Sequence, residues 1–477
     1  MKRLWRFLHT QISGAWLSLW ARLQLLTAGG RWAAQLSSTT RRSLRWLLVD
    51  GLFASLGDAI LNAYQSVYLL ALGATRTEIG WVSALSNLMM PLAMLPGARL
   101  AARTREYKRA VIFPALLARL SLLGLIFLPF FPVSNPARLI QVGLGFIVAR
   151  AFLVQLFNPA WTALLGQLVP VTSRGRYFST RNILMGAASF FALLVVGPLI
   201  DWIGTPAGYQ WAIGIALLMG LGAVFAFSHL EEPARPPTPR VPGAWRHFLR
   251  GLRGQGRFVA FCLIAGVWSF AQQIAGPFFI IFLVDEVQAS AAMVGLTSAA
   301  SSLAALPGQR IFGALNDRKG ARWVQRLTGL AIPLVPALWG YIAQPWQAFP
   351  LQLLSGFMWA GYNLAAFNLL LELTPEVDRP SYVAFYQALV GLGMAGGAVL
   401  GGWLAQMHGY GTLFWVSAGG RLLAALLFAW VIAGTAPPKL PAVHAPRPRF
   451  KVRLNFDLRR LRPHRAKEEV TDVTDGD

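Results

Sequence analysis

The sequence contains little charge and almost no cysteine. Of its 477 residues, 13% are charged and 55% are hydrophobic, whereas a typical soluble domain carries about 25% charged residues. The single cysteine, Cys262, lies inside an apolar run, so the chain cannot form an internal disulfide, a cysteine zinc site or a CxxC redox pair. The shortage of charge excludes an ordinary soluble core and indicates a membrane protein.

Apolar runs of about 20 residues, long enough for a helix to cross a bilayer, recur from Trp46 to Gly434. Their punctuation by Gly, Pro and charge predicts an all-α integral membrane protein with twelve transmembrane helices in two six-helix halves. The predicted parts are a basic amphipathic cytoplasmic segment (1–44), a first half (45–230), a cytoplasmic linker (231–257), a second half (258–434) and a flexible cytoplasmic tail, basic and then acidic (435–477).

Basic residues predict the orientation of these helices. Cytoplasmic loops accumulate Lys and Arg, and 38 of the 43 basic residues fall on the side of the two termini. The exceptions are Arg76, Arg119, Arg138, Arg150 and Arg421. Both termini are therefore predicted to be cytoplasmic. A nucleic-acid-binding domain would gather its basic residues in one patch, so we expect no nucleic-acid partner.

The N-terminal segment spaces apolar residues at helical intervals after a basic start, which predicts a helix lying on the inner leaflet. A signal peptide is the alternative, but Arg22 and Arg31 follow its short apolar part. The basic tail is also expected to be attracted to anionic inner-leaflet lipids.

An internal repeat relates the two halves. Shifting the chain by 205 positions aligns Asn158 with Asn363 and Arg174 with Arg379, and a shift of 211 aligns "LPGARL" with "LPGQRI". Repeated six-helix halves are typical of transporters that rock about a site at the middle of the bilayer. A membrane enzyme has no comparable need for this duplication.

The stretch "GALNDRKGAR" supplies a loop motif between predicted helices eight and nine. Its residues Gly313, Asp317, Arg318, Gly320 and Arg322 match the loop signature of the major facilitator superfamily. On these residues and the twelve-helix pattern, residues 45 to 434 resemble a member of that superfamily, from a bacterial group without an assigned substrate. The first-half copy, "AARTREYKR", is degraded, with Glu106 at the Asp position and no glycine.

The resemblance also implies a cytoplasmic gate. Glu372 and Arg379 match a family pattern at the end of helix ten, and Arg174 is the counterpart of Arg379 in the first half. In relatives such charges bridge to the loop signature when the carrier faces outward and separate when it opens inward. The alternative is that these charges are solvated and serve only as a topology signal.

A partial motif bears on the direction of transport. "VVGPLID" supplies the Gly197 and Pro198 of a pattern found in drug-proton antiporters, but it ends in Asp201 where relatives have paired glycines. The resemblance therefore favours efflux over uptake.

Polar residues inside the predicted helices are candidate site residues, because charges at mid-membrane are costly and usually functional. Asp58, Asn62 and Gln65 form one face of helix one, and the family places helices one, four, seven and ten around a central cavity. Arg150, near the middle of helix four, is expected to face Asp58. The two side chains either pair in the empty carrier or Asp58 exchanges a proton; a fixed structural pair is the alternative.

Further residues are expected to line this cavity because an aromatic and amide lining suits an organic ligand. They are Gln155 on helix four, Trp268 and Gln272 on helix seven, and Trp359 and Asn363 on helix ten. Hydrogen bonding between helices is the alternative role for the amides. Arg119 and Arg421 fall on helices that the family places at the periphery, and we expect burial against an acid such as Asp50.

These features predict a secondary active transporter that moves a small organic molecule by alternating access, coupled to protons, in the bacterial plasma (inner) membrane. A lipid-translocating protein, a membrane enzyme or a non-transporting sensor are the alternatives. No metal-ligand cluster, nucleophile motif or Walker-type loop supports an enzyme. We expect no cofactor and no metal, and a monomer as the working unit.

Overall fold

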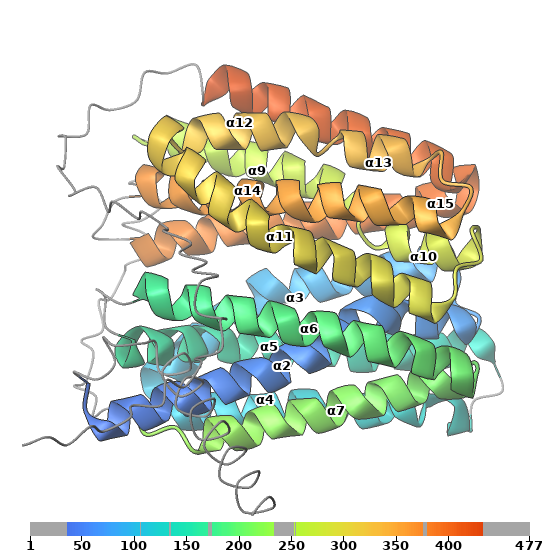
Figure 1. The fold of residues 1–477 in the computed structure, drawn as a ribbon, viewed down its shortest axis with the longest axis horizontal. Helices are drawn as coiled ribbons and strands as arrows, with labels where there is room; N and C mark the ends of the chain where they lie inside the picture. The colour runs from blue at the N-terminus through green and yellow to red at the C-terminus, as the bar shows by residue number, and fades with distance from the viewer. Residues whose placement is uncertain are drawn as a thin grey trace, which may run out of the picture. The chain divides into compact units, whose positions relative to one another are not determined.

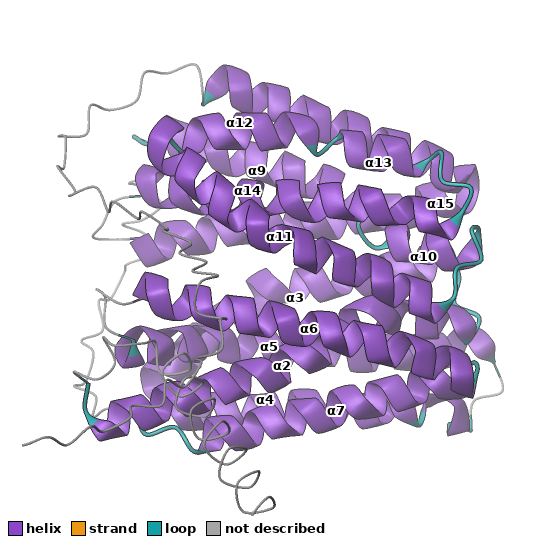
Figure 2. Cartoon of the chain, viewed as in Figure 1, coloured by secondary structure: helices purple, strands orange, loops and turns teal. Residues whose placement is uncertain are grey.

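The computed structural model describes residues 36–104, 106–132, 135–169, 174–232, 252, 254–374 and 379–432. Within these ranges the chain consists of helices and short connections, and it contains no strand (Figure 2). The predicted all-α class is therefore confirmed. Most of the predicted N-terminal segment, most of the linker and the predicted tail lie outside the described residues.

The first half of the chain contributes six long helices, joined by short turns. A capping box begins the second of them, where Thr75 accepts from the backbone N–H of Glu78 and the Glu78 side chain accepts from that of Thr75. The six are α2 (Ser38–Ala71), α3 (Arg76–Arg103), α4 (Tyr107–Ile126), α5 (Pro136–Leu168), α6 (Arg174–Ile203) and α7 (Ala207–Ser228).

The second half contains similar helices with more breaks. Pro277 separates α9 from α10, Pro333 separates α12 from α13, and α15 turns back at Gly409, whose φ is 78°. A proline interrupts the hydrogen-bond ladder of a helix. The elements are α9 (Gly256–Ala275), α10 (Phe278–Asp285), α11 (Ala291–Lys319), α12 (Ala321–Ala331), α13 (Leu334–Trp339), α14 (Ala348–Leu373) and α15 (Arg379–Val431).

Eight helical stretches in the described part of the chain are long and apolar enough to cross a membrane. One of them, Gly256–Asp285, joins α9 and α10, and another, Ser381–Val431, contains the turn at Gly409. Helix α2 is not among the eight; it carries Asp58, Asn62 and Gln65 along one face, which lowers its mean hydropathy. The chain is thus a helical protein with several membrane-spanning helices.

Two helix boundaries bear on the sequence predictions. Helix α2 begins at Ser38, ahead of the predicted start of the first half at residue 45, because the Ser37 hydroxyl accepts from the backbone N–H of Thr40 and caps the helix. Helix α11 continues through the predicted loop motif to Lys319, and Gly320 ends it with a φ of 85°. Most of the loop motif is therefore helical.

The helices define two ends of the bundle (Figure 1). Helix α2 begins, α7 ends, α9 begins and α15 ends on one side, which we call the linker end. The opposite side, the far end, contains the α2–α3 turn at residues 72–75 and the α10–α11 turn at residues 286–290.

Helix packing joins the two halves along two seams. Helix α3 packs against α15, and α6 packs against α11. A buried apolar cluster that contains Tyr64, Ile200, Phe282 and Phe414 extends over both halves. Separate clusters fill each half nearer the linker end, around Leu164 in the first and Phe261 in the second. The halves are thus continuous at their core, and this arrangement positions the polar groups described next.

Candidate functional site

A central cavity lies between the two halves. It has a volume of about 440 Å³ and is lined by α2 and α6 of the first half and by α10 and α11 of the second. The polar face of α2 supplies Ser55, Asp58 and Asn62. Facing it are the hydroxyl groups of Ser189, Ser298 and Ser302. Asp58 and Asn62 thus lie where the sequence predicted, whereas Gln65 is not among the lining residues.

Asp58 forms ion pairs with two arginines. Its Oδ1 atom lies 2.9 Å from Arg150 Nη2 and 3.4 Å from Arg119 Nη1. The Arg119 and Arg150 side chains are only 9% and 16% exposed, whereas that of Asp58 is 47% exposed. The expected proximity of Asp58 and Arg150 is therefore observed, and a third residue joins them.

Arg119 is buried against an acid, as expected, and that acid is Asp58. Helix α4 packs against α5 and α7, so Arg119 points into the first half and pairs with Asp58 instead of Asp50. Asp50 lies 3.9 Å from Arg181 instead, on α6. The sequence analysis did not identify Arg181 as a site residue. The feature that could have identified it is a charged residue within a predicted helix, one turn after Tyr177. Arg421 contacts no acid in the described chain and donates to the backbone carbonyl of Gln272.

A second cavity, the N-terminal cavity, lies inside the first half. Its volume is about 270 Å³, and α2, α4, α5, α6 and α7 line it. Asp50, Asp58, Arg119 and Arg181 contribute its charged groups, and the Arg181 guanidinium lies 5.6 Å from the centre of the Trp161 ring. Ala54, Asp58 and Met185 border both cavities. Asp58 therefore separates the central cavity from the N-terminal cavity.

Gln155, which was predicted to line the central cavity, lines neither cavity, whereas its neighbour Asn158 borders the second one. Asn158 lines it and donates to Gln155 Oε1 at 3.5 Å. Asn158 also accepts from the Thr162 hydroxyl one turn later. These contacts lie along a single helix, so they are not the interhelical hydrogen bonds considered as the alternative role.

Trp268 does not line the central cavity, contrary to expectation. It is 4% exposed and stacks on Tyr362 with ring centroids 4.5 Å apart, and Trp359 meets it edge-on at 6.0 Å. The α9 face that carries Trp268 packs against α14 and α15, so the ring lies in the core of the second half. Neither Gln272 nor Asn363 lines the central cavity. The Gln272 carbonyl faces Arg421, and Asn363 is exposed.

The predicted gate residues lie at the linker end. Arg322 Nη2 and Glu372 Oε1 are 2.9 Å apart, which joins the start of α12 to the end of α14. Gly320 forms the turn, whereas Gly313 lies inside α11 and the exposed Asp317 and Arg318 lie in its last turn. The side chains of Arg174 and Arg379 lie outside the described residues.

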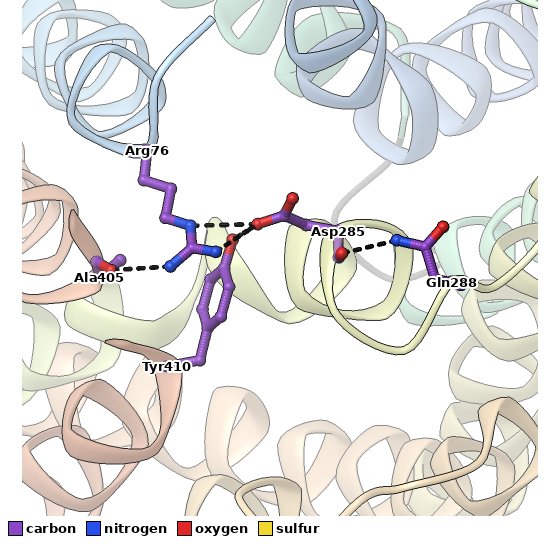
Figure 3. A network of polar contacts seen from close by, with 5 residues as sticks. All are labelled: Arg76, Asp285, Gln288, Ala405 and Tyr410. Carbon is purple, nitrogen blue, oxygen red and sulfur yellow. Dashed lines mark hydrogen bonds and ion pairs between the residues drawn. The ribbon is translucent and has the colours of Figure 1, made fainter. Parts of the chain in front are cut away.

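A polar network at the far end joins the two halves (Figure 3). Arg76 Nη2 and Nε donate to Asp285 Oδ2 at 2.8 and 3.1 Å, and Arg76 Nη1 donates to the Ala405 carbonyl at 3.1 Å. The Tyr410 hydroxyl donates to the same Asp285 oxygen at 2.9 Å. We call Arg76, Asp285 and Tyr410 the far-end network. In the sequence, Arg76 was notable only as one of the few basic residues expected at this end. The missed signal was Asp285, the acid that ends an apolar run.

A helix cap adds a second link at this end. Both carboxylate oxygens of Asp201, on α6, accept from the backbone N–H groups of Ala291 and Ala292 at 2.8 Å. The Tyr64 hydroxyl of α2 donates to the Ala291 carbonyl at 3.0 Å. An acid at a helix N-terminus satisfies otherwise unpaired donors and complements the helix dipole. Asp201, the residue that departs from the expected glycine pair, thus fastens the first half to α11.

This arrangement presents charged side chains to the two cavities. Within the described residues, no group of three or more His, Cys, Asp or Glu side chains lies close enough to hold a metal ion. The ionisable groups of the cavities are carboxylates and guanidiniums, which bind ligands and hold protons.

Comparison with known proteins places the chain in a family. The family model described as Major Facilitator Superfamily matches residues 47–272 and 261–466. Uncharacterised proteins of Mycobacterium bovis and Mycobacterium tuberculosis are each 24% identical over 430 residues, covering 86% of this chain and 99% of their own length.

Solved transporters share the fold. A bacterial homologue of the iron transporter ferroportin, in an inward-facing state, matches with a TM-score of 0.66 and 16% identity, over 83% of this chain and 99% of that one. A nucleoside transporter matches with a TM-score of 0.63 and 17% identity, over 82% of this chain and 100% of that one. A D-xylose-proton symporter matches with a TM-score of 0.62 and 16% identity, over 81% of this chain and 96% of that one. The chain therefore belongs to the Major Facilitator Superfamily, as a multi-pass membrane protein of a transporter family rather than an enzyme family.

Proposed function

We propose that the protein is a proton-coupled secondary transporter that moves a small organic molecule by alternating access. In this proposal the chain crosses the bacterial inner membrane twelve times, with both termini in the cytoplasm, and works as a monomer. The carrying observation is that Asp58 faces the central cavity between the halves while its Oδ1 atom holds two arginines. A charge placed at such a cost in the middle of a membrane protein favours a role in binding.

The contacts between the halves support alternating access. The far-end network, the Asp201 cap of α11 and the hydrogen bond from Gln273 to Ser83 all link the first half to the second. Among described residues, the corresponding ion pair of the linker end, Arg322 with Glu372, stays within one half. If the linker end is cytoplasmic, this conformation is closed to the outside.

The contacts at the two ends of the bundle also change which residues we propose as the gate. The family resemblance associates a formed charge bridge at the linker end with an outward-facing carrier, yet Arg322 and Glu372 are paired here while the far end is closed. We therefore assign the main gating contact to the far-end network, which must break for the halves to separate there.

Asp58 is the proposed proton site. Protonation would remove its negative charge and release Arg119 and Arg150, which changes the charge of both cavities at once. A carrier can couple two ligands when the binding of one alters the affinity for the other. The central placement of these charges also favours a solute carrier over a lipid-translocating protein, which would expose a polar groove toward the bilayer.

We propose export as the direction, on the resemblance of "VVGPLID" to the antiporter pattern. Gly197 has a packing role that fits this region: a Cβ there would meet the Ala291 carbonyl and Ala292 of α11. The glycine thus permits close approach of α6 and α11, the helices that must separate at the far end when the carrier opens outward.

Purified protein in liposomes provides the test. Accumulation of radiolabelled 2-naphthoate, uridine and xylose is measured with and without an imposed pH gradient, in both orientations of the gradient. We expect the gradient to drive at least one probe uphill, and we expect Asp58→Asn to lose this uphill movement. Glu231→Gln, which removes an exposed acid at the linker end, is the control. Uphill transport by Asp58→Asn would remove the proton role of Asp58. If no protein accumulates any of the three probes under either gradient, the proposed transport function is contradicted.

A further inference from the structure

The first half holds more positive than negative charge in its interior. Three guanidiniums, those of Arg119, Arg150 and Arg181, face two carboxylates, those of Asp50 and Asp58. With every group ionised, the cluster carries one uncompensated positive charge. Buried charges are normally paired because removing an ion from water costs several kcal/mol, so this excess leaves room for one further anion.

The existing acids do not saturate the arginines. A single oxygen atom, Asp58 Oδ1, serves both Arg119 and Arg150. The Nε atoms of these two arginines are buried and have no hydrogen-bond partner within the described part of the chain. An arginine presents five N–H donors in a planar fork that matches a carboxylate in two-point contact. These Nε donors are enclosed by protein, so the guanidinium groups of Arg119 and Arg181, which line the N-terminal cavity, are the ones that an anionic ligand there can contact.

The backbone is arranged to make space for two of these arginines. A Cβ at Gly220 of α7 would lie 2.5 Å from Cδ and 2.7 Å from Nε of Arg119. A Cβ at Gly51 of α2 would likewise lie 2.5 Å from Arg181 Nη2. Any larger residue would displace a guanidinium, so both glycines act as recesses that hold the charged groups in place.

Apart from Asn158, the remaining wall of the N-terminal cavity is largely apolar. Its side chains include Val111, Ile112, Val154, Phe157, Val224 and Phe227, and the Trp161 ring closes it beside Arg181. A ligand pocket with apolar walls and a few convergent polar groups binds molecules that have both characters. The cavity is therefore suited to an apolar body that carries an anionic head.

We propose that the N-terminal cavity is a binding site for an amphipathic organic monocarboxylate, whose carboxylate contacts Arg119 and Arg181 while its apolar body lies against α4, α5 and α7. The proposal rests on the proposed transport function and specifies its substrate class. Asp58 pairs with Arg119 and borders both cavities, so the site adjoins the central cavity.

The binding test uses purified full-length protein in detergent and equilibrium dialysis. The probe is radiolabelled 2-naphthoate, with neutral 2-naphthamide as a ligand of nearly the same shape. We expect the naphthoate to bind at least about tenfold more tightly, because hydrogen bonds to charged groups contribute about 1.5 to 3 kcal/mol. Equal affinity for the acid and the amide would overturn the proposal.

Variants of the site sharpen this test. Arg119→Gln is expected to weaken naphthoate binding about tenfold while leaving naphthamide binding unchanged, and Arg119→Lys to recover part of the loss. Arg138→Gln removes an exposed arginine of α5 and is the matched control. If Arg119→Gln does not fold, as judged by gel filtration, Gly220→Ala replaces it. Its control is Gly214→Ala on the same helix, where a Cβ meets nothing within 4 Å.

Naphthoate binding that is insensitive to Arg119→Gln and to Gly220→Ala would also overturn the proposal. The liposome assay separates this failure from failure of the proposed function. Gradient-driven accumulation of uridine or xylose by protein that does not bind naphthoate would leave transport standing and reject the anion site. Naphthoate binding without gradient-driven flux of any probe would retain the site and reject coupled transport.

Discussion

The two halves of the protein follow a similar helical plan, yet their interiors hold different chemistry. The first half encloses ion pairs between α2, α4, α5 and α6, namely Asp58 with Arg119 and Arg150, and Asp50 with Arg181. The equivalent depth of the second half holds an aromatic group, where Trp268 stacks on Tyr362. The interiors thus differ in how buried arginines are held: the first half pairs them with carboxylates, whereas the second half holds Arg421 against the Gln272 carbonyl.

The repeat alignment shows how this difference arose within one plan. At the shift of 205 residues, Arg150 corresponds to Ser355 and Arg181 to Tyr386, while Asn158 still corresponds to Asn363. Tyr386 stacks on Phe261 in the apolar cluster of the second half. Replacement of a few charged residues by neutral ones is therefore enough to change the chemistry of a half without changing its helices.

The largest expected effect comes from breaking a buried pair in the first half. Asp50→Ala leaves Arg181, which is 6% exposed, without its carboxylate. Loss of one partner of a buried pair costs about 3 kcal/mol or more, so we expect a clearly lower thermal unfolding midpoint in detergent. Asp317→Ala, which removes an exposed acid of the second half, should leave the midpoint unchanged. An unchanged unfolding midpoint for Asp50→Ala would show that the buried ion pair does not stabilise the first half.

The next effect concerns the corresponding loops of the two halves. Helix α11 ends at Gly320 with φ 85° and ψ 159°, a conformation accessible essentially to glycine alone, whereas α3 ends at Thr104 with φ −78°. Gly320→Ala is expected to destabilise the protein by about 2 kcal/mol, measured as a shift in the unfolding midpoint. Gly313→Ala, inside α11, should be neutral or stabilising. Equal effects of the two alanines would contradict the assigned turn.

A smaller effect is expected where the halves meet. Arg76→Gln removes the charged contacts to Asp285, and because both side chains are about one-third exposed we expect only about a tenfold shift toward opening at the far end. The measurement uses Cys262→Ser protein with Ser189→Cys in the central cavity, labelled by an impermeant thiol reagent from the far-end side. Arg138→Gln at the same end is the control. Unchanged labelling would remove the far-end network from the gate.

The smallest effect is expected in the aromatic interior of the second half. The Trp268 Nε1 donor is buried without a hydrogen-bond partner in the described chain, so Trp268→Phe removes an unsatisfied polar atom and retains most of the ring contact. We expect a change below about 1 kcal/mol in the free energy of unfolding. A large loss of stability, or loss of naphthoate binding, would show that the second half also takes part in the charged site.

Much of this organisation could be predicted from the sequence, because it depends on properties local to the chain. Hydropathy runs and proline or glycine breaks identified the helices, and the spacing of Asp58 and Asn62 placed them on the face of α2 that borders the central cavity. The partner Arg150 was also expected, since it lies near the middle of a helix that the family places at the same cavity.

Other parts of the site required the packed structure. The direction in which Arg119 and Trp268 point depends on which helices cover α4 and α9, and the rotation of a helix about its axis follows from that packing. The contacts of Arg76 with Asp285 and of Asp201 with Ala291 join residues 209 and 90 positions apart. No local pattern encodes such a pair.

The sequence by itself thus determined the class of protein, its division into two related halves and the polar face of α2, because hydrophobic periodicity and repeats are written along the chain. Only the tertiary structure decided which arginines share Asp58, that Trp268 belongs to a core, and that Arg76 and Asp285 join the halves at the far end. Side-chain partners depend on the rotation and approach of whole helices. That geometry is set by packing among all of them together.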